Sequence, residues 1–504
     1  MSQLNWWKTA CAVCVLCAVT AIALTAQTLT TLHTFDGTDG EIPYTALVQA
    51  ANGNLYGTTE VGGARGLGTA FEITPSGTFT LLYSFCSQSD CTDGSNPSAL
   101  VQASNGDFYG TTAYGGASDN CESAHNGCGT IFKITPSGTL TTLYSFCLQI
   151  GCADGEYPSA GLVQATDGNL YGTTYAGGAK LYGTVFRVSP SGMLTTLYSF
   201  CSETGCRDGR TPLGGLTEAT NGDFYGTTQY GGADSSCLDS NHGCGTIFRI
   251  SPSGTLTSLY SFCSRSNCVD GGLPEGALLQ ATNGNFYGTT FGGGANGNDG
   301  TVFKISPTGT LTTLYSFCSQ SNCTDGLWPN AALVQGTDGN FYGTTTFGGV
   351  VSGFCHSLAT GCGTLFKIIP NGALTTLYAF CSQSGCRDGS GPGAALVQDT
   401  DGGFYGTTEG GGTEYGTVFS LSVGLGPFVE TQPTSGVAGR LVKVLGTDLT
   451  GATGVTFNGT AAAFTIVSPS LITTTVPAGA TTGTVQVVTP GGTLSSNVPF
   501  RVIE

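Results

Sequence analysis

The sequence predicts an all-β protein: a seven-bladed β-propeller followed by a small β-sandwich. Three observations support this fold class. Gly accounts for 81 of 504 residues and only 9% are charged, which is typical of a turn-rich β protein. No stretch beyond residue 26 has helical periodicity. Finally, the tetrapeptide Tyr-Gly-Thr-Thr occurs seven times, beginning at Tyr56, Tyr109, Tyr171, Tyr225, Tyr287, Tyr342 and Tyr405.

Each repeat contains four strand-like segments. In the fifth copy these are "EGALLQA" (275–281), "NFYGTT" (285–290), "GTVFKI" (300–305) and "TLTTLYSF" (310–317). An Asn-Gly or Asp-Gly pair joins the first two segments in every copy, which is a strong hairpin signal. A Pro-x-Gly turn joins the last two segments of this copy. Four antiparallel strands per repeat predict a propeller blade.

The two ends of the repeat array predict a closed ring. The seventh repeat stops after its third segment, "GTVFSLS" (416–422), and the missing fourth segment stands before the first repeat as "LTTLHTF" (29–35). We therefore expect the N-terminal strand to complete the seventh blade, with the propeller spanning residues 27–424. An open solenoid would instead need capping repeats.

The N-terminus resembles an export signal. One lysine precedes the apolar segment "TACAVCVLCAVTAIALTA" (9–26), and small residues allow cleavage after Ala23 or Ala26. The alternative is a retained membrane anchor, because 18 apolar residues reach the lower limit for a span. Cleavage would leave a chain without a membrane span, located outside the cell, at its surface or in the periplasm.

The cysteines support export. Of the 21 cysteines, three lie in residues 1–26, and the other 18 form local pairs, which indicates nine disulfides. Six pairs are spaced C-x4-C: Cys86/Cys91, Cys147/Cys152, Cys201/Cys206, Cys263/Cys268, Cys318/Cys323 and Cys381/Cys386. Three are spaced C-x6-C: Cys121/Cys128, Cys237/Cys244 and Cys355/Cys362.

Metal binding is the competing interpretation of these loops. Each C-x6-C loop holds a histidine (His125, His242 or His356), but its position differs in each, which does not suit tetrahedral zinc. An Asp in a "DG" pair precedes each repeat and could bind calcium. The support is weak, because one carboxylate per loop supplies far fewer than the six to eight oxygen ligands that calcium takes. An Asp before Gly more commonly caps its own turn. We therefore expect no cofactor. These aspartates are Asp39, Asp93, Asp154, Asp208, Asp270, Asp325 and Asp388.

Residues 427–504 have a different character. They lack cysteine and the repeat, and alternate strands with turns at β-sandwich spacing. With Gly446 in "VLGTDL", "VTFNGTAA", "TTVPAGATTGTVQVVTPGG" and a closing "FRV", the segment resembles an IPT/TIG domain, which implies an immunoglobulin-like β-sandwich.

The repeats also resemble a known family. The segments "DGNFYGTT" and "GGxxxxGTxFKIxPSGTLTTLYSF", with their copies over about residues 29–422, are similar to the Gloeo/Verruco (GloVer) tandem repeat of bacterial exported proteins. The resemblance implies an exported or surface-displayed repeat protein, often with a C-terminal anchoring element. It implies no established activity.

Blade topology indicates where a ligand would bind. We call the four strands of a blade a, b, c and d. The short a–b and c–d turns should share one face, and the long b–c and d–a loops the other. Aromatic side chains on the long loops suit stacking on sugar rings, although packing between blades is an alternative. They are Tyr114, Tyr175, Tyr230, Phe291 and Phe347 after strand b, and Trp328 in a d–a loop.

Two functional hypotheses remain. The first is a non-catalytic binding or adhesion protein for a glycan or a cell-surface partner. The second is a secreted glycoside hydrolase or lyase. Glu60 and Glu409 occupy matching positions in the first and last repeats and could act as an acid/base pair, although solvated loop carboxylates are the simpler interpretation. Acidic residues converging in one pocket would favour an enzyme. A net charge of −17 argues against nucleic-acid binding.

Overall fold

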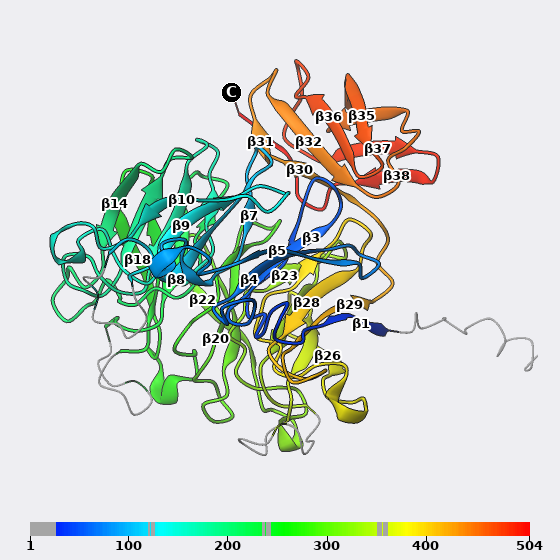
Figure 1. Cartoon of the computed structure of the whole chain (residues 1–504). Helices are drawn as coiled ribbons and strands as arrows, with labels where there is room; N and C mark the ends of the chain where they lie inside the picture. The colour runs from blue at the N-terminus through cyan, green and yellow to red at the C-terminus, as the bar shows by residue number, and fades with distance from the viewer. Residues whose placement is uncertain are drawn as a thin grey trace, which may run out of the picture.

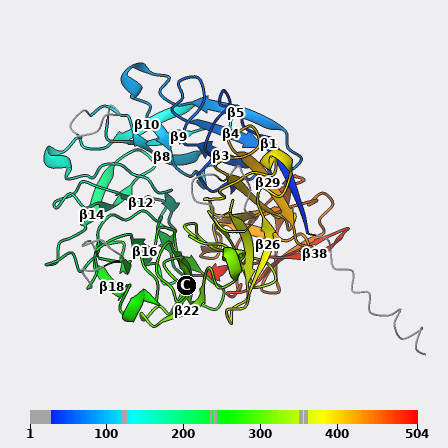
Figure 2. The ribbon, with the colours of Figure 1, turned by 90° about the horizontal axis from the view of Figure 1, so that it is seen from below.

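The computed structural model describes residues 27–118, 121, 127–233, 237, 243–349, 355 and 361–503. Within these residues the repeats form seven antiparallel sheets, each with strands in the order a-b-c-d. Figure 2 shows the sheets following one another around a ring in chain order, with the last repeat beside the first. The all-β prediction is confirmed. The export signal expected in residues 1–26 lies outside the described residues.

The strand bounds repeat closely. The a strands are β2 Val48–Gln49, β7 Val101–Gln102, β11 Val163–Gln164, β15 Thr217–Glu218, β19 Leu279–Gln280, β23 Val334–Gln335 and β27 Val397–Gln398. The b strands are β3 Leu55–Thr59, β8 Phe108–Tyr114, β12 Leu170–Thr174, β16 Phe224–Thr228, β20 Phe286–Thr290, β24 Phe341–Thr345 and β28 Phe404–Thr408. An additional strand, β6 Ser95–Pro97, pairs with β8.

The outer strands are equally regular. The c strands are β4 Thr69–Ile73, β9 Thr130–Ile134, β13 Thr184–Val188, β17 Thr246–Ile250, β21 Thr301–Ile305, β25 Thr364–Ile368 and β29 Thr417–Ser422. The d strands are β5 Phe79–Ser84, β10 Leu140–Ser145, β14 Leu194–Ser199, β18 Leu256–Ser261, β22 Leu311–Ser316, β26 Leu374–Ala379 and, for the seventh sheet, β1 Thr28–Thr34. The d strands are the most exposed of the long strands, whereas β3 and its equivalents are buried along their common length.

Close packing explains the repeated Tyr-Gly-Thr-Thr. The aromatic ring of the neighbouring c strand lies directly over the glycine: a Cβ on Gly57 would meet the Phe71 ring at 2.6 Å and Leu47 at 2.7 Å. The second threonine bonds within its sheet, as Thr59 Oγ1 does to Thr69 Oγ1 at 2.8 Å. Glycine is therefore required for space.

The other two residues of the motif join one sheet to the next. Tyr287 stacks on Phe341 of the next sheet with ring centroids 4.0 Å apart. The first threonine bonds a carbonyl of the next sheet's entry loop, as Thr58 Oγ1 does to Ser98 O at 2.9 Å. The same bond joins the last repeat to the first, from Thr407 Oγ1 to Thr45 O at 3.4 Å.

The N-terminal strand completes the last sheet, as predicted. β1 pairs antiparallel with β29 from Thr28 opposite Ser422 to Thr34 opposite Thr417. Phe35, directly after β1, is fully buried against Phe71 of the first repeat. The two ends of the repeat array are thus tied together by backbone pairing and by core packing.

The structure forms nine disulfides, in the same local pairs that the spacing predicts. Five of the six C-x4-C loops contain a short 3-10 turn: η1 Ser89–Cys91, η2 Ile150–Cys152, η3 Ser266–Cys268, η4 Ser321–Cys323 and η5 Ser384–Cys386. All these loops follow a d strand, so the disulfides close loops without linking different sheets.

The remaining C-x4-C loop differs from the other five at Cys206. Its disulfide to Cys201 forms as predicted, but this fully described loop has no 3-10 turn ending at Cys206. The Cys206 amide nevertheless donates to Glu203 O at 2.9 Å, which keeps the chain turned at this point. Cys206 is only partly buried, whereas the corresponding Cys152 and Cys386 are buried. The predicted pairing therefore holds at Cys206 without the local turn and burial found in those loops.

The C-terminal segment forms a second, smaller β unit. One sheet has the strand order β30-β32-β36-β35 and the other β34-β33-β37-β38, with β31 paired to β39. Val444, Phe457, Ile472 and Val487 belong to the core between them. The strands are β30 Val429–Gln432, β31 Ser435–Gly436, β32 Leu441–Gly446, β33 Gly454–Phe457, β34 Thr460–Ala462, β35 Phe464–Ser468, β36 Leu471–Thr475, β37 Val485–Thr489, β38 Gly492–Ser495 and β39 Arg501–Val502.

This sandwich covers one face of the ring (Figure 1). It contacts the short a–b turns of four repeats. Lys443 Nζ donates to Ser104 O at 3.1 Å, Ser470 Oγ to Ala51 O at 3.3 Å, and Phe428 N to Thr400 O at 3.0 Å. Arg501 reaches Thr220 O of the fourth repeat. We call this face, formed by the a–b and c–d turns, the turn face.

Candidate ligand-binding face

The opposite face is built by the long connections and is called the loop face. The d–a loops pair with the b–c connections through isolated bridges, for example Arg210 with Tyr230 and Leu327 with Phe347. These connections carry all the disulfides described above. The long loops therefore lie together on the side of the ring away from the sandwich.

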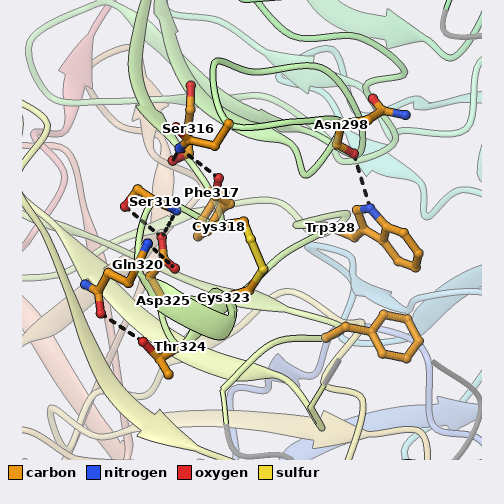
Figure 3. Close-up of a disulfide and its surroundings, with 12 residues drawn as sticks. Asn298, Ser316, Phe317, Cys318, Ser319, Gln320, Cys323, Thr324, Asp325 and Trp328 are labelled. Atoms are coloured by element: carbon orange, nitrogen blue, oxygen red, sulfur yellow. Dashed lines mark hydrogen bonds between the residues drawn. A yellow bond between two sulfur atoms is a disulfide. The ribbon is translucent and has the colours of Figure 1, made fainter. Parts of the chain in front are cut away.

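A buried aspartate organises each C-x4-C loop. Asp325 accepts hydrogen bonds from the Ser319 and Gln320 amides at 2.9 and 3.2 Å (Figure 3). It also accepts one from the Tyr315 hydroxyl at 2.7 Å. The equivalent aspartates, Asp93, Asp154, Asp208, Asp270 and Asp388, are likewise fully buried, and all accept a Tyr hydroxyl. In the first loop Asp39 instead bonds His33 Nε2 at 2.7 Å. These carboxylates act as loop caps.

Most of the described residues that cluster closely enough to ligate a metal already form disulfides. Among the described residues, the close clusters of potential ligands consist of disulfide-bonded cysteines, joined in two cases by Glu156. A sulfur in a disulfide offers no thiolate to a metal. His125, His242 and His356, which the zinc hypothesis would need, lie outside the described residues.

The centre of the loop face holds a pocket of about 520 Å³. It is lined by residues just before strand a of all seven repeats, together with Glu60 from a b–c connection and Ala113 near the end of β8. Much of its wall is made of small residues, such as Ala99, Gly161 and Gly214. We call this cavity the central pocket.

Polar side chains gather at one side of the central pocket. Tyr44, Glu275 and Asn330 line it and occupy the same position in three repeats, one residue after the proline of the d–a loop. Asn330 Nδ2 donates to the Tyr44 hydroxyl, and Gln229 Nε2 donates to Glu275 Oε1 at 2.8 Å.

Glu409 joins this group from the seventh repeat. A Cβ on Gly393 would lie 2.3 Å from the Tyr44 ring and 2.5 Å from Glu409 Oε1, so both side chains pack over that glycine. Glu409 is partly buried, whereas Glu60 opens to solvent. The interpretation of both as simple solvated carboxylates is wrong for Glu409, because closure of the ring places it against Tyr44.

Burial raises the pKa values of the carboxyl groups at this site. Burial, together with the neighbouring Glu60, raises the pKa of Glu409 to about 7. Burial raises the pKa of Glu275, and the protein atoms crowded around Glu60 raise its pKa too. Burial and the nearby Glu409, Glu275 and Glu60 raise the pKa of Tyr44. The site therefore holds a protonated carboxyl close to neutral pH, and offers both donors and acceptors.

None of the six aromatic residues predicted from sequence is among the residues that line this pocket, and they form two groups on the loop face. Trp328 stacks on Phe291 with centroids 5.2 Å apart and meets Phe347 edge-on at 5.3 Å. Its indole N–H donates to Asn298 O at 3.3 Å (Figure 3). Asn330, two residues after Trp328 in the same d–a loop, lines the pocket, so a short loop segment connects this trio to the polar side of the pocket.

The second group contains the three tyrosines. Tyr114 meets Tyr157 edge-on at 5.5 Å, and Arg210 lies over the Tyr182 and Tyr230 rings at 5.2 and 5.8 Å. Tyr175 is 37% exposed. Sequence reasoning missed Tyr44, Tyr157, Glu275 and Asn330. The sequence could have indicated them by their position, because each stands one residue before or after the proline of a d–a loop, and this proline recurs in every repeat.

A family model decides the identity of the repeats. The Gloeobacter/Verrucomicrobia repeat matches residues 17–146, 87–280 and 240–465, which together cover most of the chain. The chain belongs to the Gloeobacter/Verrucomicrobia repeat family. An IPT/TIG domain matches residues 429–502, the sandwich of this repeat protein. Both resemblances stated from the sequence are confirmed.

Solved structures similar to this Gloeobacter/Verrucomicrobia repeat protein are distant. A protein assigned as a gluconolactonase has 10% identity, a TM-score of 0.37, and coverage of 80% of this chain and 94% of its own. A protein assigned as a 6-phosphogluconolactonase from Bacteroides uniformis has 14% identity, a TM-score of 0.39, and coverage of 66% and 83%. A luciferin-regenerating enzyme has 13% identity, a TM-score of 0.37, and coverage of 64% and 89%. Likenesses this weak carry no argument about activity.

Two further comparisons concern the whole chain. None of the curated proteins compared with it matched. Across the described part of the chain, no helix has the length and apolar character to span a membrane.

Proposed function

We propose that this chain is an exported saccharide-binding protein whose ligand occupies the central pocket and the aromatic residues around it. In this proposal residues 1–26 are the export signal, residues 27–424 form a closed seven-bladed β-propeller, and residues 427–504 are an immunoglobulin-like domain docked on the turn face. Seven sheets in chain order and the bond from Thr407 to Thr45 support the closed ring. The nine disulfides fit an oxidising compartment.

The observation that carries the proposal is the polar group around Tyr44. Asn330 bonds this hydroxyl, Glu275 and Glu409 lie close enough to raise its pKa, and Gln229 bonds Glu275, so the group offers the carboxyl and amide groups that a ligand with many hydroxyls requires. The net charge of −17 disfavours anionic ligands, which makes neutral saccharides the best fit.

The aromatic trio of Phe291, Trp328 and Phe347 supplies the complementary contact. A sugar ring presents apolar C–H faces, and aromatic side chains at a pocket edge bury these faces while its hydroxyls bond to polar groups. Trp328 is partly exposed and two residues from Asn330, so one saccharide chain can contact both. Rigid disulfide-closed loops hold these side chains in place.

The test is a glycan array probed with oxidised protein comprising residues 27–504. We expect binding to neutral glycans, and a loss of about tenfold or more in affinity for Tyr44→Ala. Arg65→Ala, at a loop-face position away from the pocket lining, is the control and should bind as the wild type does. Uniform lack of binding by the wild type would refute the proposal.

A second candidate function is cleavage of a glycoside. Glu60 and Glu275 line one pocket and Glu409 packs beside Tyr44 over Gly393, which favours this function, because a carboxyl with a pKa of about 7 suits acid/base catalysis. Incubating the array ligands with the protein and measuring new reducing ends separates the two functions. Turnover that disappears in Glu409→Gln while binding persists would establish the enzyme.

A further inference from the structure

One residue in every d–a loop has an unusual backbone conformation. The residue preceding the loop proline has a positive φ, between 51° and 64°, in all seven repeats. Six of the seven carry a side chain, including the β-branched Ile42 and Thr211. We call these residues the left-handed ring: Ile42, Asn96, Tyr157, Thr211, Leu273, Trp328 and Gly391.

A second left-handed position in the same loops gives the contrast. The residue before the second cysteine of each C-x4-C loop also has a positive φ. Here the chain uses only Gly, Asn and Asp, the residues for which this conformation costs least. These are Asp90, Gly151, Gly205, Asn267, Asn322 and Gly385. The left-handed ring takes Asn and Gly at two positions, but Ile, Tyr, Thr, Leu and Trp at the other five, for which the conformation is strained.

The backbone of the left-handed ring is held by the repeat and not by its side chains. Trp328 N donates to Asp299 O at 2.9 Å, and Thr346 N donates to Trp328 O at 3.3 Å. At Tyr157 and Thr211 the backbone N–H donates to, and the backbone carbonyl accepts from, residues at the equivalent positions of their repeats, with distances of 2.8–3.0 Å. Because the backbone N–H and C=O are hydrogen-bonded in the same way in these repeats, the backbone conformation does not depend on the side chain. Local stability alone would favour glycine at each position, as at Gly391.

Three members of this ring lie at the pocket or in the aromatic groups described above, whereas Leu273 packs against a hydrophobic core cluster. Asn96 lines the central pocket, Trp328 stacks on Phe291, and Tyr157 contacts Tyr114. Tyr44, Glu275 and Asn330 follow two residues after members of the ring. A fixed backbone thus presents a different side chain from each of these repeats on the loop face.

We propose that the left-handed ring determines which saccharide the protein binds, an inference that rests on the saccharide-binding function proposed above. Each member is a separately variable position on a common backbone. Tyr157 and Trp328 supply stacking surfaces, Asn96 and Thr211 supply hydrogen-bonding groups, and Gly391 leaves space beside Glu409. In this proposal strain is retained at five positions because a glycine there would remove a ligand contact.

Trp328 provides a direct probe. The chain has three tryptophans, and since Trp6 and Trp7 lie in residues 1–26, the chain from residue 27 onward has Trp328 as its sole tryptophan. Its fluorescence should shift on titration with the bound members of a panel of cello-, manno-, galacto-, xylo- and chito-oligosaccharides. Each titration also gives an affinity for the wild type.

Glycine substitutions test the specificity claim. We expect Trp328→Gly and Tyr157→Gly, assayed by calorimetry on the same oligosaccharides, to lose about tenfold or more in affinity, with melting temperatures lowered by only a few degrees. Asn96→Gly should change the order of preference among the oligosaccharides. Asn322→Gly is the matched control, because Asn322 is left-handed (φ 59°) and exposed in the same loop as Trp328; its affinity should not change.

A gain-of-contact variant completes the test. An added Cβ at Gly391 would lie 3.8 Å from Glu409, which is an ordinary contact, so Gly391→Asn should fold and alter the preference. If wild type binds and all the ring variants keep its affinities and preference order, the specificity role is overturned while saccharide binding stands. If the glycine variants unfold, the ring is structural and the inference fails. If the wild type binds no oligosaccharide, the proposed function itself fails.

Discussion

The turn face and the loop face are made by the same seven repeats, yet they differ in almost every property. On the turn face, five-residue connections present nearly identical backbone carbonyls, and the sandwich binds those of Ala51, Ser104 and Thr400. On the loop face the connections are long, closed by disulfides, and different in each repeat. Uniform turns suit docking of one rigid domain, whereas variable loops on a rigid ring suit ligand recognition.

One turn-face residue departs from this uniformity. The residue after strand a is Ala in five repeats and Gly in one, but Asp399 in the seventh. Asp399 is 2% exposed, its Oδ1 accepts from Gln49 Nε2 at 2.8 Å, and its Oδ2 has no hydrogen-bond partner. Burial raises the pKa of Asp399 and that of Glu430 in the sandwich to about 7. The junction therefore contains two acidic groups that favour their protonated forms.

The largest effect is expected from removing β1. Deleting residues 27–36 removes the partner of β29 and the buried Phe35, and leaves an unpaired sheet edge. We expect a loss of stability of more than about 5 kcal/mol, with aggregation, measured by thermal unfolding and light scattering. Deleting 427–504 should leave the ring folded. Equal behaviour of the two truncations would contradict the closed ring.

Two tyrosines four residues apart sharpen the contrast between ring core and loop face. Tyr171 is fully buried and stacks on Phe224 at 4.1 Å, so Tyr171→Ala should destabilise by about 3–5 kcal/mol. Tyr175 is 37% exposed on the loop face, so Tyr175→Ala should change stability by less than about 0.5 kcal/mol. Denaturant titration measures both. A large loss at Tyr175 would assign it to packing between sheets.

The aspartate caps should matter more than the disulfides beside them. Asp325→Ala leaves the Tyr315 hydroxyl and two amides without their buried acceptor, at a cost of about 2–3 kcal/mol. The double variant Cys318→Ser/Cys323→Ser should cost about 2 kcal/mol or less, because the loop it closes is short. Chemical unfolding of the two variants compares them directly. The reverse order would make the disulfide the main support of the loop.

The smallest effect concerns pH at the turn face. Because the pKa values of Asp399 and Glu430 are raised, sandwich docking is most stable below the ordinary carboxyl pKa and weakens as pH rises to about 7. Nearby Asp401 adds to the repulsion on Asp399. Asp399→Asn should stabilise the protein by about 1–2 kcal/mol at pH 8 and leave it unchanged at pH 4. Chemical unfolding of the wild type and the variant at both pH values measures this difference. An equal change in stability at pH 4 and pH 8 would show that titration of Asp399 does not cause it.

Much of the fold was predictable because it is specified locally. Asn-Gly and Asp-Gly pairs define the a–b hairpins, and the displaced "LTTLHTF" segment pointed to β1 pairing with β29. The disulfide pairs followed from spacing, because cysteines five or seven residues apart on one loop are the nearest available partners. Spacing did not predict that Cys206 would pair in a loop without the 3-10 turn of the other five. The burial of Asp325 as a loop cap also followed from ordinary Asp-Gly turn chemistry.

The candidate site and the domain arrangement were decided by tertiary structure. Glu60 and Glu409 are far apart in sequence, and only ring closure brings Glu409 against Tyr44 and raises its pKa. The convergence of Glu275 and Asn330 on the same pocket depends on the radial placement of the sheets, which no single repeat specifies. The sandwich docks on backbone carbonyls of the turn face. Because every repeat has these carbonyls, the sequence does not indicate which repeats the sandwich contacts. Local sequence determines each blade, but the centre of a ring exists only when all the blades are assembled.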